Sequence, residues 1–368
     1  MTLIKRISWL VGTLQRTLFP TLEECWNAPL TEKEKQLVSI LELVEVEAFV
    51  PRSASDQWLG RKLRERESIA RSFVAKAVYG YPFTRSLIEA LKTSANLRRI
   101  CGFEWVSDIP SEATFSGAFR EFAESGLGDR VYGALVERTL ETVLVGHISR
   151  DSTAIEGREK PVKKQPKAKP APRKKGRPAK GEHWEPKEQK RLERQCNQSA
   201  EEALAELPVI CDVGTKKNSK GHKECWIGYK LHADVNDCGL PVSVAITSAS
   251  VHDSQVAIPP MTMSSSRVTY FYDVMDAAYD GVAIYELSRS LGHVPIIDKN
   301  SRGKEVIPMA LHEASRYKER SAAERFNSRL KEEFGAGNIM VRGAQKVKMH
   351  LMFGVLAIFA DQLLKLAT

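Results

Sequence analysis

The segment Arg158–Arg194 limits how this chain can fold more than any other stretch of its sequence. It contains 15 Lys and Arg residues against 5 Glu, a local net charge of +10, with six of the 17 prolines and almost no apolar side chain before Leu192. Such a segment buries too little surface to offset its chain entropy, so we expect it to be disordered when free. The folded structure must form from the residues on either side.

The excess positive charge of the chain is concentrated in this segment. The 368 residues carry a formal net charge of +9, so the remainder of the chain carries −1. A basic surplus indicates a polyanionic partner, either nucleic acid or an acidic membrane surface. The most apolar stretch, Met349–Leu366, is interrupted by polar residues, and no apolar run reaches the roughly 18 residues of a membrane span. We therefore expect a nucleic-acid partner, no membrane and no signal peptide, and hence a cytoplasmic, nucleoid-associated protein.

Residues 32 to 146 have the hydrophobic period of α-helices. Apolar residues recur at three- and four-residue spacing in stretches that begin at Ser68, near Leu87 and after Pro110. Short helices separated by turns marked by Gly or Pro suit a helix-turn-helix-like unit, and equally a plain helical bundle. We expect residues 1–135 to form an all-helical, helix-turn-helix-like region.

From residue 136 onward the pattern is that of an α/β domain. Strands are expected at Thr142–Ser149, Trp226–Val235, Gly239–Thr247, Arg267–Val274 and His293–Ile297. Helices are expected at His252–Ile258, Gly281–Ser290, roughly Pro308–Phe334 and Lys346–Lys365. Strands that first meander and then alternate with helices indicate a mixed sheet with helices packed on it. This order resembles the ribonuclease-H-like fold, which we expect at residues 136–368, with a basic insertion at 156–200 between the first two strands.

Three acidic residues stand at meaningful places in this layout. Asp151 directly follows the first strand, Asp276 lies just past the fourth, and Glu324 is inside the long C-terminal helix. In a ribonuclease-H-like sheet the first and fourth strands are neighbours, so the two aspartates would lie side by side and the helix can bring Glu324 against them. Converging carboxylates repel one another unless cations lie between them, and oxygen ligands select Mg²⁺ or Mn²⁺. Two such ions about 4 Å apart can support in-line phosphoryl displacement.

The helix around Glu324 carries a specific spacing of polar residues. Tyr317, Arg320, Glu324 and Lys331 follow one another at steps that place all four on one helical face. This Y-x2-R-x3-E-x6-K spacing resembles the signature of DDE transposases of bacterial insertion sequences, in the group with the Y-R-E-K helix. Further similarity to this family runs along most of the chain from about Ser68.

The resemblance implies a function and a set of roles. The three acids would hold two Mg²⁺ ions, for which Mn²⁺ can substitute, and Tyr317, Arg320 and Lys331 would contact the DNA backbone near the scissile phosphate. The N-terminal helical region would bind the terminal inverted repeats of the mobile element. The protein would cleave double-stranded DNA at the element ends and join the 3′-hydroxyls to target DNA, as a homodimer on paired ends.

Two alternative functions share the same fold. One is a DNA-binding protein that has lost catalysis, and the presence of all three acids counts against it. The other is a nuclease or Holliday-junction resolvase that cuts without joining, which would need neither the Y-R-E-K helix nor so large a helical region.

Two acidic positions have alternatives that the sequence leaves open. Asp273 lies close to Asp276 and could be the ligand instead, although the second aspartate of the family stands shortly before a tyrosine, as Asp276 does before Tyr279. His252 and Asp253 have the pattern of a helix start near the site, for which a capping or hydrogen-bonding role is favoured over catalysis.

Basic residues outside the helix are the remaining candidates for DNA contact. Lys230 and His232 alternate along one strand face, which indicates either a contact with DNA or a solvated edge. Within the insertion, Lys174, Lys175 and Arg177 belong to a stretch that resembles the AT-hook, whose Gly-Arg-Pro core lies in the minor groove. This match is partial, because a lysine precedes the glycine, so binding to phosphates irrespective of sequence is favoured over reading of the groove.

Overall fold

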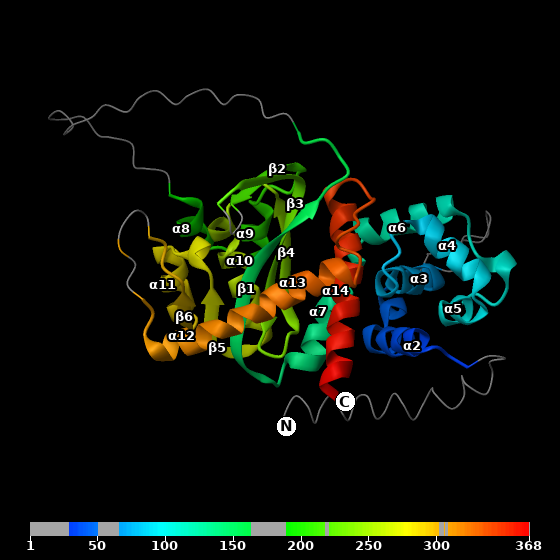
Figure 1. Ribbon diagram of the computed structural model, residues 1–368, viewed down its shortest axis with the longest axis horizontal. Helices are drawn as coiled ribbons and strands as arrows, with labels where there is room; N and C mark the ends of the chain where they lie inside the picture. The colour runs from blue at the N-terminus through cyan, green and yellow to red at the C-terminus, as the bar shows by residue number, and fades with distance from the viewer. Residues whose placement is uncertain are drawn as a thin grey trace.

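The computed structural model describes residues 29–50, 66–162, 189–217, 221–301, 305 and 308–367. Figure 1 shows a sheet covered by helices on one side of the molecule and a group of helices on the other, with the long helix α14 (Ala344–Ala367) between them. Lys174, Lys175 and Arg177 of the basic insertion lie outside the described residues.

The sheet is mixed, as the sequence predicts. Its strands are β1 (Leu144–Glu156), β2 (Asp212–Lys217), β3 (Lys223–Asn236), β4 (Pro241–Ser248), β5 (Thr269–Met275) and β6 (Val294–Ile297). The order is β2-β3-β1-β5-β6, with β4 also paired to β3. β1 runs antiparallel to β3 and parallel to β5, and β5 runs parallel to β6. β1 and β5, the first and fourth of the predicted strands, are therefore neighbours.

The first strand is longer than its sequence suggests. The prediction that Asp151 follows this strand is wrong, because β1 continues to Glu156 and Asp151 pairs with Ala233 of β3. Hydrogen bonds to β3 hold residues 150–156 in the sheet, although this stretch is less apolar than the residues before it. Sequence reasoning also missed β2 and two short helices, α8 (Arg191–Gln195) and α9 (Ala200–Ala205). α8 lies inside the range assigned to the insertion.

The helices that cover the sheet follow the prediction with two differences. They are α10 (Ile258–Arg267), α11 (Val282–Ser290), α12 (Leu311–Tyr317) and α13 (Ser321–Glu332), with 3₁₀ turns η3 (Asp253–Val256), η4 (Ala277–Tyr279) and η5 (Lys318–Arg320). α10 was not predicted, and the single long helix expected at 308–334 is divided by η5. The backbone carbonyl of Glu319 in η5 accepts a hydrogen bond from Ser149 Oγ of β1 at 2.7 Å, which anchors the divided helix to the sheet.

The N-terminal part of the described chain is helical. Its helices are α2 (Glu32–Val44), α3 (Arg66–Val78), α4 (Thr84–Thr93), α5 (Ala95–Ile100), α6 (Glu112–Glu124) and α7 (Leu127–Leu140), with 3₁₀ turns η1 (Val46–Phe49) and η2 (Val106–Asp108). The C-terminal helix α14 packs against α2, α3, α6 and α7, and Phe353 of α14 stacks on Phe73 of α3 with ring centroids 5.5 Å apart. One hydrophobic core therefore runs from the helical part through α14 into the sheet.

α14 is apolar because it is a core helix. By length and composition it could cross a membrane, with a mean hydropathy of 1.5 over its most apolar window. However, 78% of that window is buried inside the protein, so its apolar surface is already covered by protein.

Candidate active site

The parallel pairing of β1 with β5 brings the two predicted aspartates together. Arg150 of β1 is paired with Met275, the last residue of β5. Asp151 follows Arg150 within β1, and Asp276 directly follows the end of β5, so the two residues lie at the same level of the sheet. The negative charge of Asp276 raises the pKa of Asp151, as expected for two neighbouring carboxylates.

The environment of both carboxyl groups favours their neutral form. Burial first, and then the carboxylates of Asp276 and Asp253, raise the pKa of Asp151 to about 6 against the opposing effects of a backbone hydrogen bond from Ser152 and of Arg320. Burial also raises the pKa of Asp276, although this carboxylate caps η4 by accepting a hydrogen bond from the backbone N–H of Ala278 at 2.9 Å. Two half-buried carboxylates this close need a cation nearby to remain ionised together.

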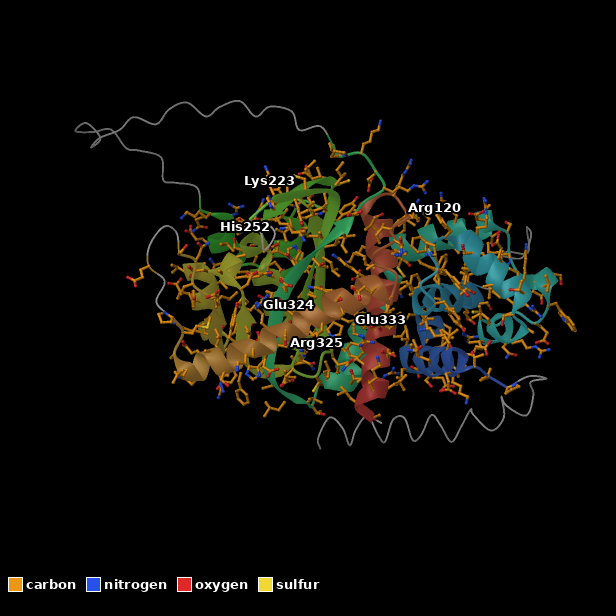
Figure 2. The ribbon with its side chains drawn as sticks, in the orientation of Figure 1. Arg120, Lys223, His252, Glu324, Arg325 and Glu333 are labelled. Atoms are coloured by element: carbon orange, nitrogen blue, oxygen red, sulfur yellow. The ribbon has the colours of Figure 1, made fainter. Side chains whose placement is uncertain are left out.

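Glu324 lies on the helix that crosses the sheet in front of β1 (Figure 1). α13 packs on both β1 and β3, and Figure 2 labels Glu324 on it beside Arg325. The Glu324 carboxylate accepts a hydrogen bond from Arg320, and its side chain is 51% exposed. Within the described chain, no three His, Cys, Asp or Glu side chains are grouped closely enough to hold a metal ion as they stand. To join the two aspartates in binding a metal ion, the Glu324 carboxylate would have to give up its contact with Arg320.

The other residues of the Y-R-E-K helix lie on both sides of Glu324. The guanidinium of Arg320 lies 5.9 Å from the ring centroid of Tyr317 and is close enough to Asp151 and Asp276 to interact with both charges. Lys331 lies farther along α13 and lines a groove of about 410 Å³ with Glu156, Lys216 and Trp226 among others. Burial lowers the pKa of Lys331, and Lys216 lowers it further.

Asn327 belongs to this site and was missed by sequence reasoning. Its side-chain amide donates a hydrogen bond to Asp151 Oδ2 at 3.1 Å, and the residue is only 6% exposed. Its Oδ1 atom is buried and has no hydrogen-bond partner among the described residues. The signal was present in the sequence, since residues 320, 324, 327 and 331 lie on one helical face.

A fourth acid, Asp253, is bound to Ser152, the residue after Asp151, and its charge raises the pKa of Asp151. Ser152 Oγ donates to Asp253 Oδ1 at 2.8 Å, and Lys230 Nζ lies 2.9 Å from the same oxygen. Lys230 also donates to the carbonyl of Val251 at 2.9 Å, and its side chain is 13% exposed. The geometry favours a role for Lys230 in positioning Asp253 over a contact with DNA.

The structure tests the predictions made for two histidines near Asp253, His252 and His232. His252 precedes η3, and its Nδ1 accepts a hydrogen bond from the backbone N–H of Ser254 at 3.3 Å, so the expected capping role is confirmed. His232 does not lie on a solvated edge or face DNA, because it is 1% exposed and lies 2.9 Å from Thr247 Oγ1. Burial lowers the pKa of His232 to about 4.

The two candidates for the second aspartate differ in their surroundings. Asp273 is fully buried and binds Arg150 at 3.5 Å, Tyr270 OH at 3.1 Å and Ser288 Oγ at 2.7 Å. Arg150 in turn forms a bidentate pair with Asp234 at 2.7 and 2.6 Å. Side chains alternate along a strand, so this ion network lies on the face of β1 opposite Asp151. Because the oxygens of Asp273 already bind partners in the core, the geometry favours Asp276 as the second aspartate of the metal site.

Comparison with known protein families agrees with this geometry. A family model described as Transposase DDE domain matches residues 147–360, and one described as Transposase domain (DUF772) matches residues 25–121. Neither the curated proteins nor the solved structures include a match to this chain. DDE transposase domains are metal-dependent polynucleotidyl transferases that generally use Mg²⁺, and the mixed sheet with flanking helices is consistent with their ribonuclease-H-like fold. Since the first model covers more than half of the chain, the protein belongs to the DDE transposases.

Proposed function

We propose that this transposase binds the terminal inverted repeats of its mobile element, cleaves both ends and transfers their 3′-hydroxyls to target DNA. The observation that carries the proposal is the adjacency of Asp151 and Asp276 on β1 and β5, with the helix of Glu324 packed across β1. We assign end recognition to residues 1–135 and chemistry to residues 136–368. Because two ends must be joined in one event, the active form is a homodimer on paired ends.

The residues at this site fit two Mg²⁺ ions, or Mn²⁺ ions, in their chemistry. The three acids offer only oxygen donors, which these hard cations prefer. Burial and mutual repulsion favour protonation of Asp151, a cost that a bound cation would remove. The unpartnered Oδ1 of Asn327 is a further oxygen acceptor at the same place. When bound, the two ions would activate the attacking oxygen and stabilise the leaving one.

The side chains of the protein itself position the reaction. Asn327 holds Asp151 by its hydrogen bond, and Lys230 and Ser152 fix the position of Asp253, whose charge acts on Asp151. Arg320 supplies the positive charge nearest the acids and can move from Glu324 to a DNA phosphate without leaving the site. Tyr317, the last residue of α12, and Lys331 of α13 extend the contact along the DNA backbone.

The basic insertion adds a second means of holding DNA. We assign Lys174, Lys175 and Arg177 to phosphate contacts, supported by the net charge of +10 between residues 158 and 194. Such contacts are independent of sequence, and they would keep the protein on the nucleoid between transposition events.

Replacement of Glu324 by Gln tests the catalytic assignment. Glu324→Gln keeps the size of the side chain and removes the charge that would hold metal. The matched control is Glu333→Gln, because Glu333 is also paired with an arginine four residues earlier on α13 and has a similar side-chain exposure, 49% against 51%. The assay uses labelled DNA carrying the element ends, with Mg²⁺, and measures binding, cleavage and joining separately.

The outcomes separate the proposal from its alternatives. We expect wild type and Glu333→Gln to cleave and join, and Glu324→Gln to bind the ends with at least a hundredfold loss of both reactions. Cleavage at the wild-type rate by Glu324→Gln would refute the carboxylate assignment. Binding without cleavage by wild type would favour a DNA-binding protein that has lost catalysis, and cleavage without joining would favour a nuclease.

A further inference from the structure

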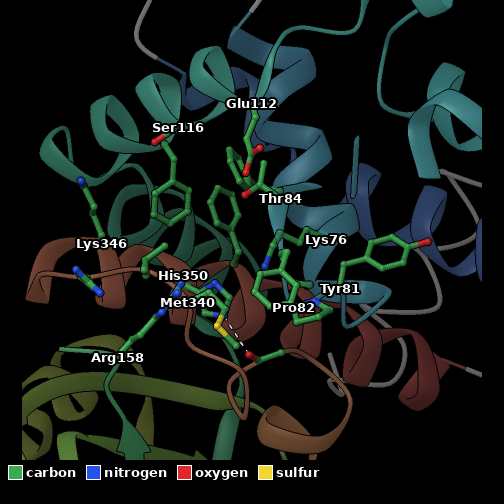
Figure 3. A pocket seen from close by; sticks show the side chains of 18 residues that line it. Lys76, Tyr81, Pro82, Thr84, Glu112, Ser116, Arg158, Met340, Lys346 and His350 are labelled. Carbon is green, nitrogen blue, oxygen red and sulfur yellow. Dashed lines mark hydrogen bonds between the residues drawn. The ribbon is translucent and has the colours of Figure 1, made fainter. Parts of the chain in front are cut away.

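A groove separate from the acidic site lies between the helical part and the end of the sheet. Its volume is about 390 Å³, and its walls come from α3, α6, α14, the chain after β1 and the loop before α14. Figure 3 shows Lys76, Arg158, Lys346 and His350 among the side chains that line it. Pockets of about 300–1,000 Å³ hold small organic ligands, and one nucleotide falls in this range.

Lys76 is the most unusual residue of this groove. It is 7% exposed, and no hydrogen-bond acceptor or carboxylate partner is found for its ammonium within the described part of the chain. Burial lowers the pKa of Lys76 to about 8. A buried and unpaired ammonium is costly, and the cost is removed if an anion enters the groove.

Three further cations surround the opening. Arg158, Arg342 and Lys346 line the groove, and none of them forms an ion pair with a carboxylate in the described ranges. The acid in the lining, Glu112, already has a partner, since its carboxylate lies 3.5 Å from Arg85. The groove therefore has an uncompensated positive charge, which selects an anionic ligand.

The groove also offers apolar and aromatic surface. Phe73, Phe119 and Phe353 form its buried wall, and Phe83 at the edge is 46% exposed. Tyr81 is half-buried and stacks on Tyr79 with ring centroids 5.4 Å apart. An exposed aromatic ring beside clustered cations matches the chemistry of a nucleotide, whose base stacks while its phosphate binds the cations.

We propose that this groove binds one nucleotide of a DNA strand, with its phosphate at Lys76, Arg342 and Lys346 and its base against Phe83. The inference rests on the proposed function only in taking DNA as the partner. Asp151 and Arg158 are seven residues apart on largely extended chain, about 23 Å at roughly 3.3 Å per residue. That separation corresponds to about seven nucleotides along a strand, at roughly 3.4 Å per nucleotide. The groove would hold a nucleotide away from the scissile phosphate and so set where the strand enters the active site.

The first test compares two variants at the start of α14 and in the loop before it. Arg342→Ala with Lys346→Ala removes two cations of the groove, whereas Lys348→Ala, two residues farther on, removes a lysine that is paired with Asp129 at 2.7 Å outside it. A fluorescent single-stranded oligonucleotide is titrated by anisotropy at several salt concentrations. We expect the double variant to bind at least tenfold more weakly, with a salt dependence smaller by about one to two phosphate contacts. Lys348→Ala should match wild type.

The second test asks whether a base is recognised as well as a phosphate. Phe83→Ala should lower the affinity for the intact strand about tenfold, and should not change the affinity for a strand with abasic sites. Lys76→Met should weaken binding while leaving the folded protein at least as stable as wild type, because it removes an unpaired buried charge.

Several results would overturn the inference. Unchanged affinity in the double variant would exclude the groove as a DNA site. Equal effects of Phe83→Ala on intact and abasic strands would exclude base recognition. A destabilised Lys76→Met that binds DNA normally would make Lys76 structural. All three can occur while Glu324→Gln still abolishes cleavage, so failure of this inference is distinguishable from failure of the proposed function.

Discussion

The buried ion network of Arg150, Asp234 and Asp273 should be the group of polar side chains whose disruption destabilises the fold most. Arg150 is 1% exposed and is the cation shared by Asp234 and Asp273. Replacing it with Met leaves both carboxylates buried without a cation. Loss of one partner of a buried pair costs about 3–5 kcal/mol. A second estimate agrees, since protonating one carboxyl of ordinary pKa near 4 at pH 7 costs about 4 kcal/mol.

The control is an ion pair with the same geometry near the surface. Arg66 binds Glu121 through the same two nitrogens, Nε and Nη2, at 2.7 and 2.8 Å, but the Glu121 side chain is 49% exposed. We expect Arg66→Met to lower the free energy of unfolding by less than about 1 kcal/mol, because exposed pairs contribute little. The comparison holds the substitution and the bidentate hydrogen-bond pattern constant; burial differs, and Arg150 also serves a second carboxylate, Asp273.

Urea unfolding followed by circular dichroism at pH 7 and pH 5 measures both variants. The loss for Arg150→Met should be about 4 kcal/mol at pH 7. It should fall to about 1.4 kcal/mol at pH 5, because protonating a carboxyl group that has lost its cation then costs less. Arg66→Met should show little change with pH. A loss for Arg150→Met within 1 kcal/mol of the control, or one that grows at pH 5, would refute the reasoning.

Three further predictions concern the site and its strands. Asn327→Ala should slow cleavage of DNA ends at least tenfold while lowering the free energy of unfolding by only about 1 kcal/mol, and an unchanged rate would contradict its positioning role. Burial and nearby acids raise the pKa of Asp151 from 3.8 to about 6. The contribution of Asp151 to the stability of the folded protein is therefore fully present below pH 4 and is lost as the pH rises through 6. Asp151→Asn should therefore be more stable than wild type by up to about 3 kcal/mol at pH 8 in EDTA, with the gain disappearing near pH 4 and equal stability at pH 8 refuting it. Gly228→Ala should lower the free energy of unfolding by more than about 2 kcal/mol, because the new Cβ would overlap the carbonyl oxygen of Ile155 and the φ of 149° disfavours a side chain. The control is Gly133→Ala in α7, whose Cβ would meet nothing within 4 Å and which should be neutral or stabilising by up to about 1 kcal/mol. Equal denaturation midpoints for the two variants would contradict this.

Local features of the sequence were sufficient to identify the family and most elements of the catalytic domain. Hydrophobic period is a local property, so the five strands predicted between residues 142 and 297 all exist, with shifted ends. The Y-R-E-K spacing is contained in one short stretch of sequence and indicated a DDE transposase, and the match to the Transposase DDE domain confirms that family. Charge composition likewise located the basic insertion without any knowledge of the fold.

The tertiary structure decided what depends on partners distant in the sequence. Asp151 lies within β1 because pairing with β3, more than 70 residues later, extends the strand past its apolar part. Asp273 forms an ion pair with Arg150, and Lys230 forms one with Asp253. No local sequence pattern reveals such pairing. The core of the helical region is completed by α14, the last helix of the chain. Sequence period tells which face of an element is buried, whereas the partner that buries it is chosen by packing and hydrogen bonding across the whole fold.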